Sequence, residues 1–437
     1  KRAKRWTQDI AEVLRALIVE MPRTQGERSV KLTAEEQAML AGEMGPAKRW
    51  AIDHQIKVGR AFDAPDLVPV SQAHMMADPE SVGVAGVTFL EQLADEGAKV
   101  AIPMITDPRG VDLDYYQPLG QTEEMADIDR RTIAACTRMG ILMTNTCVNY
   151  QTIMPPVRGE HVAFGDTGVV IYCNSVCGAR SNFEGGPSAL AAGLTGRTPR
   201  YGLHLDEKRR ATRRFRVRQQ PRGLTDWGLL GAVVGQMSGS YWAVPVIEGI
   251  DVAPTSDQMK HLGAAMASYG STPLFHMVGI TPEAATLADT GGDKLAVEEI
   301  DTQAIDAMRS RFGRKGDAID VVVFAAPQLS LVEMQSVARL VDGKTMKVPV
   351  IVCTSPQVYP DAARMQLIAT IEKSGAKVLQ GTCFYNQYAR EIGDANGWTR
   401  LLSNSAKIVN ILGGYGYQPA LASMEDCVAS AIKGEIV

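Results

Sequence analysis

The sequence predicts an α/β protein built of layered domains with largely parallel sheets. Two observations support this class. Short apolar segments alternate with helical segments along most of the chain, and two consecutive βαβ units follow one another near its end. The chain has 437 residues, several times the length of a common domain, and 45% of them are hydrophobic, so we expect more than one buried core.

The first elements are defined by capping signals. We expect residues 1–28 to form an N-terminal extension with a peripheral helix and a polar link. Thr33 and Glu36 then form a capping box, which marks the start of a helix, and Gly45 followed by Pro46 should interrupt that helix.

The next elements follow from hydrophobic patterning, and we expect residues 29–295 to form one α/β core region. The predicted strands are 66–71 and 99–104, and the predicted helices are 87–96 and 123–139.

Residues 296–437 are expected to form a C-terminal α/β domain with two consecutive βαβ units. The predicted strands are 318–325, 348–354 and 376–382, and the predicted helices are 330–340 and 362–374. Such units place three loops at the carboxyl edge of one sheet, where ligands of open α/β sheets usually bind. Cys353 and Cys383 lie at two of these strand ends.

Charge and composition exclude several classes of protein. A formal net charge of −4 and a charged fraction of 22% argue against a basic nucleic-acid binder, an acidic solvating protein and a disordered chain. The longest apolar segments are too short for a membrane span. Seven scattered cysteines and no visible export signal predict reduced thiols in a cytoplasm.

One block of the chain, residues 144–204, is dense in small polar side chains, glycine and arginine. Small side chains let the backbone approach a ligand, and Arg180 or Arg197 can bind a carboxylate through its two-pronged guanidinium. We expect this block to form the wall of a buried polar pocket.

Motifs in this block and beyond it follow one another in a recognisable order. They are Leu32-Thr33-x-x-Glu36, Thr146-Cys147-x-x-Tyr150, Gly159-Glu160-His161, Asn174-Ser175-Val176-x-Gly178-Ala179-Arg180, Thr195-Gly196-Arg197, Thr382-Cys383 and Asn404-Ser405-Ala406-Lys407. In this order the sequence resembles the large subunit, or large domain, of aconitase X over about residues 30–437.

The resemblance implies a hydro-lyase of the aconitase superfamily, with layered α/β/α domains around an iron–sulfur cluster or a mononuclear iron held by three cysteines. Family members dehydrate small hydroxy acids, either cis-3-hydroxy-L-proline or mevalonate 5-phosphate. The chemistry is consistent, because iron can act as a Lewis acid on a substrate hydroxyl while a base removes the proton next to the carboxylate. Thiolates are suitable ligands for such iron.

The resemblance assigns Cys147 and Cys383 as metal ligands and leaves the third ligand open. Many relatives carry Gly-Cys-Pro-His where this sequence has Ala325-Ala326-Pro327-Gln328, so one expected cysteine is missing. Cys353 is the preferred third ligand, because it ends the next strand of the same sheet, and Cys177 is the alternative.

The remaining site residues divide into two groups. His161 and Lys407 are the catalytic candidates, and the substrate-binding candidates are Asn149, Ser175, Arg180, Ser403 and Ser405. A small swivelling subunit or domain with a Gly-Arg-Gly-Ser-Ser-like loop is implied as a partner, since this chain has no such loop. The large chain alone should therefore be inactive.

The predicted reaction is the dehydration of cis-3-hydroxy-L-proline to pyrroline-2-carboxylate. Two alternatives stay open. One is a mevalonate 5-phosphate dehydratase, and the other is a metal-free binding or scaffold subunit, suggested by the missing cysteine.

Overall fold

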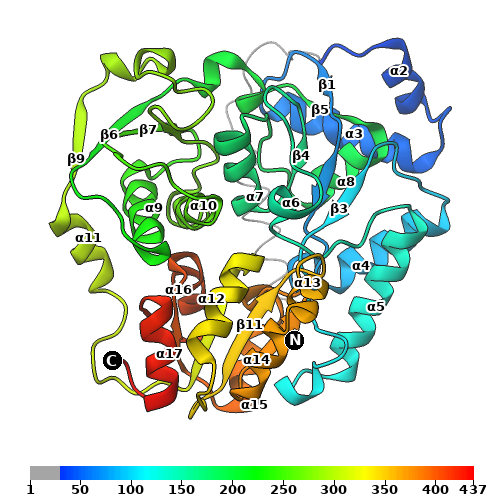
Figure 1. Ribbon diagram of the computed structural model, residues 1–437. Helices are drawn as coiled ribbons and strands as arrows, with labels where there is room; N and C mark the ends of the chain where they lie inside the picture. Colours follow the sequence, from blue (N-terminus) through cyan, green and yellow to red (C-terminus); the bar gives the residue numbers. More distant parts are fainter. Residues whose placement is uncertain (1–29) are drawn as a thin grey trace, which may run out of the picture.

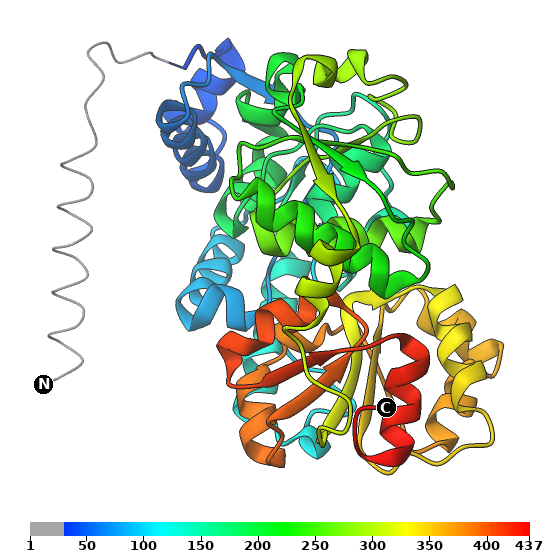
Figure 2. The same ribbon diagram turned by 90° about the vertical axis from the view of Figure 1, so that its left-hand side faces the viewer.

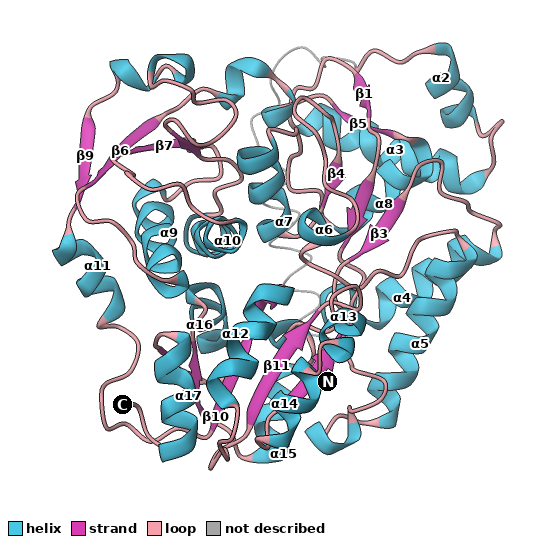
Figure 3. Cartoon of the chain, viewed as in Figure 1, coloured by secondary structure: helices cyan, strands magenta, loops and turns pink. Residues whose placement is uncertain are grey.

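Three sheets of parallel strands carry the fold, and helices cover each of them (Figures 1 and 3). The computed structural model describes residues 30–437, so the predicted N-terminal extension lies outside the described residues. Among residues 30–437, none of the helices combines the length and the apolar character needed to span a lipid bilayer. The observed α-helices and parallel sheets confirm the predicted α/β class.

The first sheet has the strand order β3-β2-β4, and β1 pairs separately with β5 in antiparallel fashion. The strands of this part are β1 (Leu67–Pro69), β2 (Ala73–Met75), β3 (Met104–Thr106), β4 (Ala163–Phe164) and β5 (Arg197–Pro199). Its helices are α2 (Ala34–Ala41), α3 (Pro46–Ala61), α4 (Pro79–Asp95), α5 (Glu123–Arg138), α6 (Asn149–Thr152), α7 (Thr167–Tyr172) and α8 (Gly186–Thr195).

The predicted helix start and interruption are confirmed in this part. The Thr33 hydroxyl accepts the Glu36 N–H at 3.3 Å, and the Glu36 carboxylate accepts the Thr33 N–H at 2.7 Å. The helix ends at Gly42, whose φ of 88° is left-handed, and α3 restarts at Pro46.

The strand predicted at 99–104 is wrong over most of its length. The Val100 N–H donates to the Met139 carbonyl at 3.0 Å, and the Ala101 N–H donates to the Gly193 carbonyl at 2.7 Å. These bonds tie the segment to helix ends, so regular pairing with β2 begins only at Met104.

The second sheet has the order β8-β7-β6-β9, with all neighbours parallel. Its strands are β6 (Arg213–Val217), β7 (Pro245–Glu248), β8 (His276–Met277) and β9 (Val297–Ile300), and its helices are α9 (Leu224–Ser238), α10 (Ser256–Gly270) and α11 (Thr302–Arg309). Helices α9 and α10 pack very closely, since a Cβ at Gly235 would lie 2.4 Å from the Met266 carbonyl oxygen.

The third sheet has the order β12-β11-β10-β13-β14, all parallel. Its strands are β10 (Val321–Leu329), β11 (Val350–Thr354), β12 (Lys377–Gln380), β13 (Arg400–Ser403) and β14 (Gln418–Leu421). Its helices are α12 (Leu331–Val341), α13 (Tyr359–Arg364), α14 (Leu367–Lys373), α15 (Ala389–Asn396), α16 (Ala406–Leu412) and α17 (Met424–Lys433).

The two predicted βαβ units are confirmed in this third part. The second predicted helix is divided into α13 and α14, because Gln366 adopts a left-handed φ of 62° between them.

One central core joins the three parts. It includes Phe164 of the first part, Phe215 of the second and Val321 and Val323 of β10. The alternate residues of β10 face a separate core beneath α12 and α17, as the two-residue period of a strand requires. This central core continues from the third part into the other two, which lie above it in Figure 2.

Candidate functional site

Loops that follow strands of the first and third sheets meet at the centre of the molecule. Asp107 follows β3, Asp166 follows β4, Cys383 follows β12 and Lys407 follows β13. The Lys407 Nζ lies 3.4 Å from the Asp166 Oδ2, and the Tyr385 hydroxyl donates to the same oxygen at 3.4 Å. In Figure 1, β11 of the third part points up toward this region. The carboxyl edges of the two sheets thus face each other across one site.

Cys147 and Cys383 come together in this region. Cys147 precedes α6, Cys383 precedes the short turn Phe384–Asn386, and both side chains are buried. Burial, together with a hydrogen bond to the Cys383 thiol, raises the pKa of the Cys147 thiol well above its usual value. Two of the predicted metal ligands, far apart in the sequence, are therefore neighbours in the fold.

The two candidates for a third thiol differ in their surroundings. Cys353 lies in β11, and the Thr382 hydroxyl donates to its sulfur at 4.0 Å; burial raises the pKa of Cys353 to about 12. Cys177 ends a π-helical turn, and its thiol pairs with Cys173. Cys353 is thus next to the Cys383 loop, whereas Cys177 is engaged elsewhere.

The two thiols, Cys147 and Cys383, are side chains of a type that suits an iron centre. Cys147 and Cys383 are soft ligands in a buried position, and the Lys407 ammonium opposes part of the rise that burial causes in the pKa of Cys147. Within residues 30–437, no three side chains of His, Cys, Asp or Glu are close enough together to hold a metal ion. Cys147 and Cys383 are thus neighbours of a suitable chemical type, and within the described residues no third side chain of these types completes a set with them.

Buried charges surround the thiols. Burial alone would lower the pKa of Lys407, but the Asp166 carboxylate and the two thiols outweigh this effect and raise it. Burial tends to raise the pKa of Asp166, but Lys407 lowers it below the usual value. Lys407 and Asp166 therefore form a buried ion pair of 3.4 Å.

Asp107 differs from Asp166. Burial raises the pKa of Asp107 well above its usual value, and the Asp166 charge raises it further. Neither of its carboxyl oxygens has a hydrogen-bond partner, although the His74 Nε2 lies 3.5 Å from one of them. Two carboxyl groups with opposite pKa shifts are typical of acid–base sites.

Several buried amides and hydroxyls near the thiols also lack partners. Both polar atoms of the Asn149 and Asn386 amides and the Tyr150 hydroxyl have no hydrogen bond. Each residue lies within three positions of Cys147 or Cys383 in the chain. Since buried polar groups in proteins are normally paired, this group is suited to bind a polar ligand.

Ser403 and Ser405 position Lys407. The Ser405 hydroxyl caps α16 by accepting the Ile408 N–H at 3.3 Å and donates to the Ala326 carbonyl at 2.5 Å. The Ser403 hydroxyl accepts the Ser405 N–H at 3.2 Å. These bonds fix the turn from which α16 presents Lys407.

Three predicted site residues make their contacts elsewhere. The His161 Nδ1 lies 2.8 Å from the His204 Nδ1, and Arg180 pairs with Asp206 at the surface. The Ser175 hydroxyl accepts the Phe275 N–H at 2.9 Å. The structure does not bring these three side chains together with the two thiols.

Asp107, Asp166 and Tyr385 were not anticipated from the sequence. Asp107 and Asp166 each follow a short buried strand, which is the signal that could have revealed them, and Tyr385 follows Cys383 by two positions.

Three family models match the chain in succession. The aconitase X first domain matches residues 29–207, the second domain residues 211–310 and the third domain residues 319–433.

Curated relatives and a solved structure cover most of the chain. The phosphomevalonate dehydratase large subunit of Methanothermobacter thermautotrophicus is 34% identical over 89% of this chain and 95% of its own. The cis-3-hydroxy-L-proline dehydratase of Hypocrea jecorina is 30% identical over 93% of this chain and 69% of its own. The crystal structure of Thermococcus kodakaraensis aconitase X in its holo-form superposes with a TM-score of 0.84 at 30% identity, covering 92% of this chain and 100% of that one.

Proposed function

Since the chain belongs to the aconitase X family and is a hydro-lyase, we propose that it removes water from cis-3-hydroxy-L-proline to give pyrroline-2-carboxylate. One observation carries the choice of substrate. Lys407, the buried cation of the site, is already balanced by Asp166, so this ion pair leaves no surplus positive charge. A zwitterionic amino acid, with zero net charge, suits such a centre.

The two charged groups of the substrate have suitable counterparts. The Lys407 ammonium stabilises the substrate carboxylate and the negative charge that develops there as the neighbouring proton leaves. The unpartnered oxygens of Asp107 accept hydrogen bonds from the ring ammonium of the substrate, whose positive charge would lower the raised pKa of Asp107 and favour its ionised form. The Asn149 amide, which also lacks a partner, is free to orient the substrate hydroxyl.

An iron centre held by Cys147 and Cys383 would supply Lewis-acid assistance to the departing hydroxide. The buried side chains of Lys407, Asp107 and Asn149 bind and orient the substrate. We further propose that a small swivelling subunit or domain supplies the base and closes the site. Names such as "large subunit" among the relatives support a partner of this kind.

A second substrate, mevalonate 5-phosphate, is favoured by one finding. Relatives that match over 95% to 99% of their own length are named phosphomevalonate dehydratase large subunit. Its phosphate would need a cation beyond Lys407, contributed by the partner.

The test is a direct comparison of both substrates with the protein and its small partner present. We expect pyrroline-2-carboxylate from cis-3-hydroxy-L-proline, with a kcat/KM at least tenfold above that for mevalonate 5-phosphate, followed by mass spectrometry. The reverse preference would refute the assignment of the substrate, and turnover of neither acid would refute the activity.

A further inference from the structure

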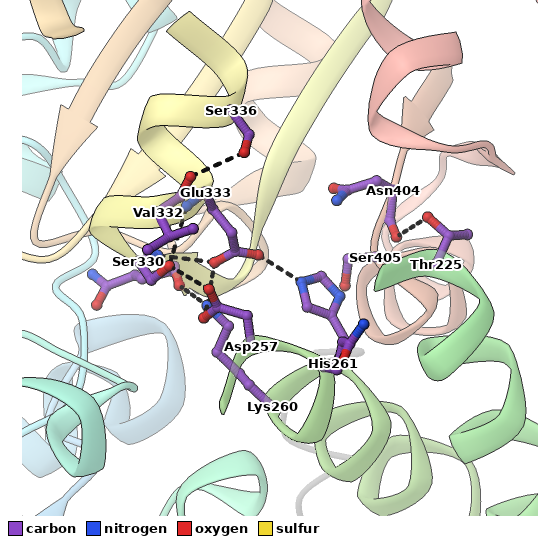
Figure 4. A network of polar contacts seen from close by, with 12 residues as sticks. Thr225, Asp257, Lys260, His261, Ser330, Val332, Glu333, Ser336, Asn404 and Ser405 are labelled. Atoms are coloured by element: carbon purple, nitrogen blue, oxygen red, sulfur yellow. Dashed lines mark hydrogen bonds and ion pairs between the residues drawn. The ribbon is translucent and has the colours of Figure 1, made fainter. Parts of the chain in front are cut away.

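A buried ionic cluster joins the second and third parts of the molecule (Figure 4). Lys260, His261 and Asp257 lie on α10, and Glu333 lies on α12. The Glu333 carboxylate pairs with the Lys260 ammonium and accepts a hydrogen bond from the His261 Nε2 at 2.8 Å. Asp257 lies 3.2 Å from the Lys260 Nζ.

Lys260 is fully buried, and each of its three donor positions has an acceptor. Besides Glu333 and Asp257, its Nζ donates to the main-chain carbonyl of Gln328 at 3.2 Å. A buried ammonium is costly unless its hydrogen bonds are satisfied, so its geometry is well defined. The carbonyl of Gln328, near the end of β10, is therefore fixed from the side of α10.

The same turn is fixed from the side of α12. Glu333 also accepts the Ser330 N–H at 2.9 Å, and the Ser330 hydroxyl accepts the Glu333 N–H at 3.2 Å, which forms a capping box at the start of α12. The Ser330 hydroxyl in turn donates to Asp257 at 2.7 Å. The last residues of β10 are thus held on both sides.

The side chain of Gln328 connects the two thiol loops. Its Oε1 accepts the Cys147 N–H at 3.3 Å, and its Nε2 donates to the Asn145 carbonyl at 3.1 Å. The same Nε2 donates to the Thr382 carbonyl at 3.1 Å, directly before Cys383. The main-chain N–H of Gln328 donates to the Cys147 sulfur at 3.4 Å. One buried side chain therefore bonds to both loops at once.

We propose that Gln328 is a positioning residue that holds the Cys147 and Cys383 loops at a fixed separation, and that the Lys260–Glu333 pair fixes Gln328 in turn. The inference rests on the two thiols being part of the site of the proposed function, and it does not depend on which hydroxy acid is dehydrated.

The test compares Gln328→Met, which keeps the size of the side chain and removes its hydrogen bonds, with a matched control. The control is Gln357→Met, which removes one hydrogen bond to the Thr144 carbonyl of the same loop and touches neither thiol. Each protein, stripped of metal, is treated with iodoacetamide, and the labelling rate of every cysteine is followed by mass spectrometry. Cys136 and Cys427, buried in other parts of the core, serve as internal references.

We expect Gln328→Met to raise the labelling rates of Cys147 and Cys383 at least fivefold relative to the two reference cysteines, and to lower kcat at least tenfold. Gln357→Met should leave the relative labelling rates of Cys147 and Cys383 unchanged, and kcat as well. An equal rise in the labelling rates of all cysteines would mean that Gln328 only stabilises the fold, and this would overturn the proposal. An unchanged labelling rate of Cys147 would overturn it too.

A second variant keeps the proposal testable if Gln328→Met does not fold. Gln328→Asn retains the amide but is one methylene shorter, so it can reach one loop but not both, and it should give an intermediate labelling rate. Parent-like rates and activity in Gln328→Asn would contradict the role of the bridge. Turnover of neither hydroxy acid by the parent, with the labelling difference intact, would reject the proposed function and leave the positioning role standing.

Discussion

Replacing Glu184 with glutamine should make the protein more stable at neutral pH and leave it unchanged in mild acid. Glu184 is buried, and its Oε1 accepts the Thr198 hydroxyl at 2.7 Å. Burial raises the pKa of Glu184 from its ordinary 4.5 to about 7. In the unfolded chain this carboxyl ionises near pH 4.5, so the unfolded state binds fewer protons than the folded state between pH 4.5 and about 7. Stability therefore falls as pH rises through that window and levels off above it.

The magnitude follows from the pKa difference. At 1.36 kcal/mol per pKa unit, the change from 4.5 to about 7 lowers the free energy of unfolding by about 3 kcal/mol at pH 8, relative to its value in mild acid. Glutamine cannot ionise and still accepts the Thr198 hydroxyl, so Glu184→Gln should recover about 3 kcal/mol at pH 8. With an unfolding entropy of about 2.1 cal/mol/K per residue, the melting temperature should rise by about 3 °C.

The assay is thermal unfolding of parent and variant at pH 5 and pH 8, followed by circular dichroism. The control is Glu425→Gln, an exposed residue in the first turn of α17, which should shift both melting temperatures equally. An equal gain for Glu184→Gln at the two pH values, or no gain at pH 8, would refute the reasoning, because the effect would then not arise from a buried ionisation.

The remaining predictions concern the site and the helix packing. Lys407→Met should lower kcat/KM by about 100-fold in steady-state assays, because it removes the buried cation that balances the substrate carboxylate; activity within threefold of the parent would exclude that role. Cys147→Ala and Cys383→Ala should abolish bound iron in anaerobically purified protein while Cys136→Ala retains it, and a parent protein without iron would favour the scaffold alternative. Gly235→Ala should destabilise the protein by about 1 to 3 kcal/mol in urea unfolding, because its methyl group would meet a main-chain carbonyl of the facing helix; an unchanged urea midpoint would show that the helices separate easily.

The fold was largely predictable where local signals agree with the tertiary structure. The C-terminal βαβ units were found because β10 and β11 are continuous apolar segments, as strands buried on both faces must be. The failure at 99–104 has a different cause. That segment has an apolar pattern, but its main-chain groups bond to the ends of α5 and α8, which no local pattern reveals.

The site was predictable only in part, because motif order says little about which side chains converge. Cys147, Cys383 and Lys407 were identified and meet at the centre of the molecule. His161 and Arg180 belong to equally clear motifs, yet their polar atoms are engaged by His204 and Asp206. A lone aspartate after a strand, such as Asp107, has no motif, and it becomes a candidate only because its buried oxygens lack hydrogen-bond partners.

The pairing of Cys147 with Cys383 has a consequence for biosynthesis. Roughly 240 residues separate them, so at about 5 to 20 residues per second the ribosome exposes the first thiol some 12 to 50 s before the second. During that interval the nascent chain carries only one thiol of the pair. Loading of any metal at this pair must therefore follow the synthesis of Cys383, and the Cys147 thiol depends on the reducing power of its surroundings until then.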